Sequence, residues 1–263
     1  MPERPAQEAI ERLEKIVRRS KRGSTVQLPQ GFARDIKNAV PDPVLAGLLR
    51  HGNGLLVKVY LTVVMAATSH PHKVQLSNPE IAEALGLPDP GGNGERQGAG
   101  ARRVRKAMAE LEKRKLVRRE PRHGHAPITH VLDGRGAGED LGDLPLGKPW
   151  ITLPIALWKR GWFIALSPRA IAVLVVLREL TYRRSHSRGT YVDGTRKRQY
   201  GLSDDTWTRA TRELEDAGLL IVEREVYEDR GEPRRRNLYT LRLDLLSVMD
   251  PGDAVPTTPV NAD

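Results

Sequence analysis

The sequence contains no cysteine among its 263 residues. This absence excludes disulfide bonds, thiol-based catalysis and zinc sites with cysteine ligands. No apolar run reaches the roughly 20 residues that a membrane-spanning helix requires, and residues 1–15 lack the apolar core of a signal peptide. We therefore expect no membrane partner and a cytoplasmic location.

Motifs for enzymatic chemistry are also missing. The sequence has no Gly-x-Ser-x-Gly motif and no paired-carboxylate signature, and its acidic residues mostly alternate with basic ones, as on solvated helix faces. Residues 142–148 fit the start of a phosphate-binding loop, but Pro149 stands where a magnesium-binding Ser or Thr is required. We therefore expect neither an enzyme nor a cofactor.

Histidines occur as two His-x-His pairs, at residues 70–72 and 123–125. The second pair, with His130 and a nearby aspartate, has the residue types of a metal site. It falls at a predicted hairpin turn, where little would hold the ligand geometry, so we expect no metal. Relaxases combine His-apolar-His with a tyrosine nucleophile, but both pairs lack the apolar middle residue, and Tyr182 and Tyr200 have no clear metal partner.

What the sequence does have is positive charge. Its 43 Lys and Arg residues outnumber its 33 Asp and Glu residues, which gives a formal charge of +10 and a pI of about 10.0. Such an excess favours an anionic partner, and nucleic acid is the simplest one.

The most informative stretch covers residues 101–132. The helical spacing of its apolar residues predicts one buried face, formed by Val104, Ala107, Met108 and Leu111. We expect a strand from Leu116, a basic loop over residues 118–125, and an antiparallel strand over residues 128–132. A basic helix followed by a basic hairpin suits duplex DNA, because the helix enters the major groove while the hairpin follows the backbone.

The preceding residues predict the rest of a small domain. Residues 55–69 form a mostly apolar run that suits a buried helix, and residues 74–76 suit a brief strand. A second helix starts at Ser77, where Glu80 completes a capping box, and it ends at Gly86.

Residues 87–100 separate the second and third helices, where a helix-turn-helix normally has a tight turn. We interpret them as a floppy insertion. The alternative is a mobile loop that brings Arg96 to the phosphates.

The pattern occurs twice, because residues 203–243 repeat the stretch just described. Trp207 and Leu214 both stand 103 residues after their counterparts, Val104 and Leu111. Since Trp207 replaces a core aliphatic residue, we expect it in the core rather than as a stacking platform. We expect two strands after the helix, over residues 220–227 and 237–243, and a turn between them that holds Arg230 and residues 234–236.

The repeat extends upstream. Residues 170–182 suit a second buried helix, residues 190–192 a small strand and residues 195–200 a very basic short helix. Residues 26–29 also resemble residues 151–154. Each copy spans about one hundred residues, which is a normal domain size.

Before the repeat, residues 6–21 predict an amphipathic helix with Ile10 and Leu13 on its apolar side. Basic residues at its end, including Arg22, suit the negative end of the helix dipole. We expect the helix to pack on the first copy. The alternative is dimerisation, which makes a homodimer a possible assembly.

This pattern resembles the winged helix-turn-helix superfamily, in tandem. The resemblance implies an α+β, mostly helical fold of two winged helix-turn-helix domains with an extra N-terminal helix. The expected divisions are an N-terminal helix (residues 1–23), a first domain (24–133), a Gly-rich linker (134–149), a second domain (150–246) and a disordered tail (247–263).

Tandem winged helices are similar to iteron-binding plasmid replication initiators, and they also occur in transcription regulators. The resemblance implies sequence-specific binding of double-stranded DNA, at the nucleoid, by a regulator or initiator that acts through occupancy. One alternative is a protein-interaction adaptor in chromosome or plasmid maintenance. Another is a nuclease or relaxase.

The expected DNA contacts fall on both copies. In the first copy they are Arg102, Arg103, Arg105 and Lys106 on the third helix, with Arg118, Arg119, Arg122 and His123 on the hairpin. In the second copy they are Arg196, Lys197 and Arg198 on the second helix, Thr206, Thr208, Arg209 and Arg212 on the third, and Arg234, Arg235 and Arg236 on the hairpin. Arginine suits guanine because its planar fork meets two acceptors, whereas hairpin cations suit phosphates and the minor groove.

Overall fold

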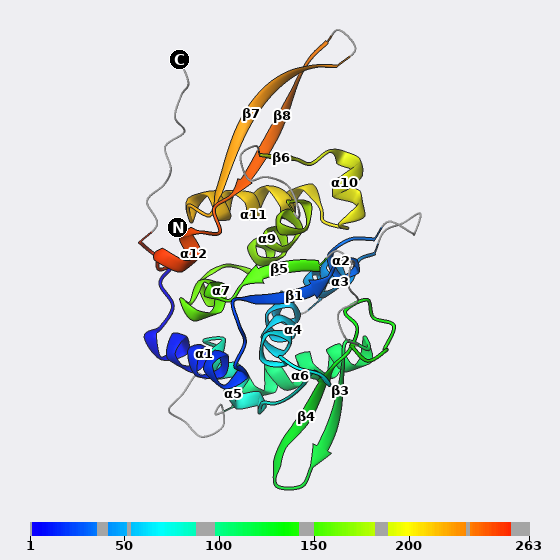
Figure 1. Cartoon of the computed structure of the whole chain (residues 1–263), viewed down its shortest axis with the longest axis vertical. Helices are drawn as coiled ribbons and strands as arrows, with labels where there is room; N and C mark the ends of the chain where they lie inside the picture. The colour runs from blue at the N-terminus through cyan, green and yellow to red at the C-terminus, as the bar shows by residue number, and fades with distance from the viewer. Residues whose placement is uncertain are drawn as a thin grey trace.

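The structure is a computed structural model that describes residues 2–35, 42–51, 54–87, 98–141, 150–181, 189–229 and 232–253. Arg96, Tyr182, Arg230 and the phosphate-loop match at residues 142–148 lie outside these ranges. The fold is α+β, as expected, with many short helices and small antiparallel sheets (Figure 1). No helix in the described part has the length and apolar character to cross a bilayer.

Two series of elements follow the N-terminal helix α1 (Gln7–Ser20). The first half consists of β1 (Thr25–Pro29), α2 (Gln30–Ala33), α3 (Val44–Arg50), α4 (Leu55–Ala66), β2 (Lys73–Gln75), α5 (Asn78–Ala84), α6 (Ala99–Lys113), β3 (Val117–Arg122) and β4 (His125–Val131). The second half consists of β5 (Trp150–Pro154), α7 (Ala156–Lys159), α8 (Trp162–Ala165), α9 (Pro168–Leu180), β6 (Thr190–Tyr191), α10 (Gly194–Gln199), α11 (Asp204–Asp216), β7 (Leu220–Asp229) and β8 (Glu232–Leu241), and α12 (Leu245–Val248) follows.

The two halves have the same order of helices and strands. Their sheets are also equivalent, with strand order β2-β4-β3 in the first half and β6-β8-β7 in the second. The capping box predicted at Ser77 and Glu80 is present. In the second half, the hydroxyls of Ser167 and Ser203 accept hydrogen bonds at the starts of α9 and α11. The repeat seen in the sequence is therefore also present in the structure.

Strands β1 and β5 pair with each other and join the two halves. The paired residues include Val26 with Leu153, Gln27 with Thr152, and Leu28 with Ile151. Because residues 26–28 correspond to residues 151–153, this antiparallel register is the same from either strand. A pseudo-two-fold axis therefore passes through the Gln27–Thr152 pair, and turning Figure 1 upside down exchanges the halves.

Helices α4 and α9 form the centre of one continuous apolar core. Both helices are buried along most of their length, and they contact each other. Helices α2 and α3 of the first half also pack on α9 of the second. The core therefore crosses the boundary between the copies, and the two domains expected from the sequence share their interior.

A buried carboxylate adds polar contacts between the halves. Glu179 of α9 is 7% exposed and accepts hydrogen bonds from Gln30 of α2 and from the Tyr200 hydroxyl. Arg34 lies 3.8 Å from Glu179 and donates to the Gln199 side chain, with Nη2 to Oε1 at 2.6 Å. Tyr200 is a structural residue in this network, and burial beside Glu179 raises its pKa.

Helix α1 buries its apolar face within the chain. Ile10 and Leu13 are both buried, and the helix contacts α5 and α4 of the first half and α7 of the second. It therefore bridges the halves, so the expectation that it packs on the first copy describes only part of its contacts. Since its apolar face is covered, this face does not offer a dimerisation surface.

Three expected boundaries differ from the structure. In the second hairpin, residues 234–236 lie in β8 and pair with β7, so they are not part of the expected turn. The basic loop predicted over residues 118–125 is wrong, because Arg118 to Arg122 continue strand β3 and the turn shrinks to His123 and Gly124. Gly124 permits this tight turn with a φ of 71°. The start of the expected disordered tail, residues 247–253, is instead packed on the second half, since the Trp162 indole donates to the Met249 carbonyl oxygen and Arg160 pairs with Asp250.

The first part of the Gly-rich linker is also fixed in place. Asp133 is 8% exposed, accepts hydrogen bonds from Arg135 and raises the pKa of that guanidinium. The Asp133 backbone N–H donates to the Glu139 carbonyl oxygen, and Leu132 pairs with Asp140 in an isolated antiparallel β-bridge. Residues 133–141 therefore fold back on the first half, and residues 142–149 lie outside the described ranges.

Arg22 caps the end of α4 rather than its own helix. Its guanidinium donates to the carbonyl oxygens of Val64, Met65 and Ala67, at 2.7, 2.9 and 2.8 Å. The last carbonyl groups of a helix have no partner within the helix, so this side chain satisfies acceptors that would otherwise be buried without a donor.

We predict that Arg22→Ala lowers the free energy of unfolding by about 2 kcal/mol, because buried acceptors lose a charged donor. Urea unfolding monitored by circular dichroism measures the change. Arg18→Ala is the matched control, since Arg18 is an exposed cation near the end of α1 and its loss should cost less than ~0.5 kcal/mol. Equal effects of the two substitutions would contradict the capping role.

Lys58 lies where the halves meet. Its Nζ donates to the Ile164 carbonyl oxygen at 2.9 Å, from α4 to α8. Burial lowers the pKa of Lys58 to about 8, although the negative charge of Glu213 partly opposes this shift.

We predict that Lys58 makes the stability of the chain rise between pH 8 and 10.5, because the unfolded chain still holds a proton that the folded chain has released. Lys58→Met should therefore stabilise the chain at pH 7, by about 1–2 kcal/mol. This advantage should shrink by pH 10. An advantage that is independent of pH in urea unfolding would show that Lys58 does not titrate in this way.

Candidate nucleic-acid interface

Helix α6 has one apolar, buried face and one basic, exposed face. Val104 and Leu111 are fully buried, whereas the four expected contact residues of this helix are exposed. Within the described part of the chain, Arg103, Arg105 and Lys106 have no hydrogen-bond or ion-pair partner. The acidic residues of α6, Glu110 and Glu112, lie in its C-terminal half. Arg103, Arg105 and Lys106 in the N-terminal half of α6 are therefore cations that no acidic side chain of the described residues neutralises.

The hairpin of the first half stands beside α6. A groove of about 360 Å³ lies between them, lined by Glu112, Arg119, Pro121, Arg122, His125 and Pro127. Arg122 and His123 are exposed near the turn, and Arg118 is exposed but lies 3.1 Å from Asp140.

Arg119 has a different role from its neighbours. Its side chain donates to Glu112 from Nε at 3.0 Å and from Nη2 at 2.7 Å, and its backbone N–H donates to the same carboxylate. Burial alone would raise the pKa of Glu112, but these hydrogen bonds hold it below its usual value. Arg119 therefore ties the hairpin to α6 and is less available to a ligand than Arg122.

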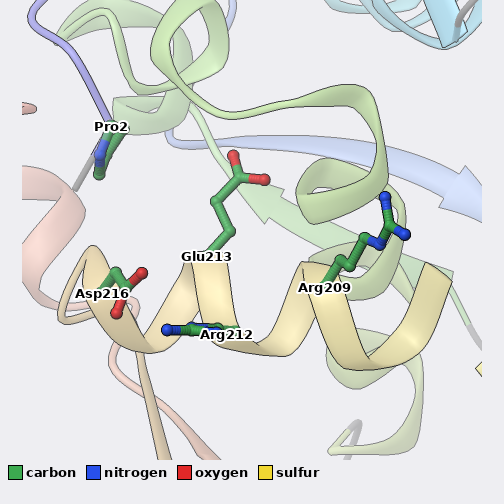
Figure 2. Close-up of a pocket in the computed structure, with 5 residues that line it drawn as sticks. All are labelled: Pro2, Arg209, Arg212, Glu213 and Asp216. Carbon is green, nitrogen blue, oxygen red and sulfur yellow. The ribbon is translucent and has the colours of Figure 1, made fainter. Parts of the chain in front are cut away.

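The expected contacts on α11 are less uniform than those on α6. Thr208, Arg209 and Arg212 are exposed, but Thr206 is half-buried and accepts a hydrogen bond from the Ser203 hydroxyl. Arg209 Nε donates to Asp205 at 2.8 Å. Figure 2 shows Arg209 and Arg212 beside Glu213 and Asp216 around a shallow pocket of about 340 Å³, which the N-terminal Pro2 also lines.

Trp207 lies in the core, as expected. It is 2% exposed, and its indole N–H donates to the Tyr239 hydroxyl at 3.1 Å. Lys197 of α10 lies 5.6 Å from the centre of the Trp207 ring and 3.3 Å from Asp204. Lys197 is therefore engaged within the second half.

The other two basic residues of α10 are less constrained. Arg196 is half-buried, and its Nη1 lies 3.5 Å from the Tyr191 carbonyl oxygen. Arg198 is exposed and donates only locally, to Thr195 at 3.1 Å. Of the three, Arg198 is the most open to solvent ligands.

The hairpin of the second half holds an aromatic stack that the sequence analysis missed. The Arg236 guanidinium lies 4.6 Å from the Tyr227 ring centre and 5.3 Å from that of Tyr191, and it pairs with Glu225 at 2.6 Å. The alternation of Glu225 and Tyr227 on one strand could have indicated a shared face. Arg236 is therefore internally held, whereas Arg234 and Arg235 are exposed.

The histidines are not gathered into a metal site. Among the described residues, no group of three or more His, Asp or Glu side chains is arranged to hold a metal ion. His130 instead lies 3.2 Å from the Glu120 carboxylate across the first hairpin.

Exposed cations therefore lie on α6 and at the tip of its hairpin in the first half, and on α10, α11 and β8 in the second. Comparison with protein-family models, with curated proteins and with solved structures finds no match for this chain.

Proposed function

We propose that the chain is a tandem winged-helix protein that binds double-stranded DNA in a sequence-specific way and acts by occupancy, as a transcription regulator or replication initiator. The order of helix, small strand, helix, helix and hairpin in each half supports this fold assignment. In such domains the third helix enters the major groove and the hairpin contacts the flanking backbone.

The observation that carries the proposal is a set of three cations in the N-terminal half of α6 that have no acidic partner among the described residues. Arg103, Arg105 and Lys106 project from a helix whose opposite face is anchored in the core. The N-terminal residues of a recognition helix are those that contact base edges. Exposed arginines on a rigid helix suit guanine, and the groove near the C-terminal end of α6, which Arg122 and His125 line, suits a phosphate.

The pseudo-two-fold axis supports contact with one duplex. Figure 1 looks roughly along this axis, so rotation about it leaves α6 and α11 at similar depth, with the two hairpins extending in opposite directions. We infer that one duplex lying along the long axis contacts both halves of the chain. Dimeric regulators use a comparable two-fold arrangement, in which their recognition elements contact successive turns about 34 Å apart.

We predict that affinity for duplex DNA falls steeply with salt, because bound cations displace counterions from phosphates. Arg105→Ala should lower affinity for a preferred site by about 5- to 100-fold, as expected for a lost guanine contact. Fluorescence anisotropy with labelled duplexes measures both effects. Arg18→Ala removes the same charge from α1, which is outside α6 and its hairpin, and should change affinity less than Arg105→Ala does.

The alternatives give other results. Binding that is independent of salt, or equal losses from Arg105→Ala and Arg18→Ala, would count against DNA as the ligand and favour an adaptor. Metal-dependent nicking of duplex DNA that is lost with His72→Ala would favour a nuclease.

We also predict that Arg122→Ala and Arg119→Ala separate binding from stability. Arg122 is exposed at the hairpin tip, so its loss should weaken DNA binding about 3- to 10-fold and leave unfolding unchanged. Arg119→Ala should lower the free energy of unfolding by about 1–2 kcal/mol, because it breaks a hydrogen-bonded ion pair. The reverse pattern would show that Arg119 is the ligand contact.

A further inference from the structure

The two helix pairs of the repeat carry opposite distributions of charge. In the first half, α5 has two acidic residues and no basic one, whereas α6 has five basic residues and two acidic ones. In the second half, α10 has three basic residues and no acidic one, whereas α11 has two basic residues and five acidic ones. The formal charge is therefore +3 on α6 and −3 on α11, although the two helices occupy equivalent places.

The difference is greatest where base contacts would be made. The N-terminal half of α6 holds four cations and no acidic residue. The corresponding part of α11 holds Asp204, Asp205 and Arg209, and Arg209 is paired with Asp205. Aspartates suit the positive end of a helix dipole, but here they would face the phosphates that border a major groove.

The rest of the exposed face of α11 continues this pattern. Asp216 lies beside Arg212 in the pocket of Figure 2, next to the buried Pro2. Glu213 is engaged with the backbone N–H of Ser167 at 2.6 Å, at the start of α9. The arginines of α11 therefore stand among carboxylates, and this face gains little from the approach of DNA.

The positive charge of the second half lies instead on α10 and near the start of β8, where Arg234 lies 3.9 Å from Glu232. Arg198 is exposed on α10, and Arg234 and Arg235 are exposed on β8. In a helix-turn-helix the first helix of the pair crosses the sugar-phosphate backbone, so cations there bind phosphates without reading sequence.

We propose that the two halves divide the work on one duplex: α6 alone reads base sequence, while the second half holds the phosphate backbone through α10 and β8, with α11 outside the groove. This inference rests on the proposed function. It assigns sequence specificity to Arg103, Arg105 and Lys106, and it predicts a binding site with one conserved block beside a stretch of neutral sequence.

Selection of duplexes from a random library tests the arrangement with the full chain. One conserved block, shorter than the footprint protected from nuclease, is the expected result. Two conserved blocks separated by about one helical turn, ~10 base pairs, would overturn the inference and leave DNA binding intact. Failure to enrich any sequence would overturn the proposed function itself.

Matched variants identify the helix that contacts the bases. Lys106 and Arg209 are equivalent in the repeat, as are Arg105 and Thr208. The double variant Arg105→Ala with Lys106→Ala should change the selected sequence and lower affinity about 5- to 100-fold. Thr208→Ala with Arg209→Ala should leave the selected sequence unchanged and alter affinity less than ~3-fold. A changed sequence preference in the second variant would show that α11 reads bases.

Arg198→Ala tests the backbone contact. It should reduce the slope of log affinity against log salt by about one and weaken all sequences equally. An unchanged slope would remove α10 from the interface. Circular dichroism of each variant confirms folding, and every substituted side chain is exposed, so the variants should fold normally.

Discussion

The pairing of β1 with β5 is the constraint on which the remaining architecture depends. A two-stranded ribbon is only marginally stable alone, but here Val26, Leu28, Ile151 and Leu153 bury one side of it in the shared core. Because the register is the same from either strand, it imposes a pseudo-two-fold axis on everything attached to it. The chain therefore resembles a dimer whose interface has been built into one polypeptide.

Apolar burial stabilises that interface, and buried polar contacts fix the relative placement of the two halves. Helices α4 and α9 bury nearly all their side chains, which leaves no separate core for either half. The Glu179 network and the Lys58 contact add groups that must find partners when buried, so they favour one relative placement of the halves. Helix α1 stabilises the same junction, because it contacts α4 and α5 of the first half and α7 of the second.

Symmetry of the backbone does not extend to the surface. The axis places α6 and α11 in equivalent positions, yet one helix is basic and the other acidic. A duplicated domain needs to keep its buried residues to keep its fold, whereas exposed residues are free to change without loss of stability. This freedom explains how two copies with matching cores, such as Val104 and Trp207, carry different charges and, in our proposal, different tasks.

The sequence alone determined the elements and their repetition, because apolar spacing, Ser77, Ser203 and the position of Trp207 report on local helix geometry and burial. It also identified the cations of α6. Only the tertiary structure decided how the copies meet, since the partners of β1, Arg22 and Glu179 lie far away along the chain. Likewise, only tertiary contacts decided which cations are already occupied, because pairing depends on distances between side chains that composition does not contain.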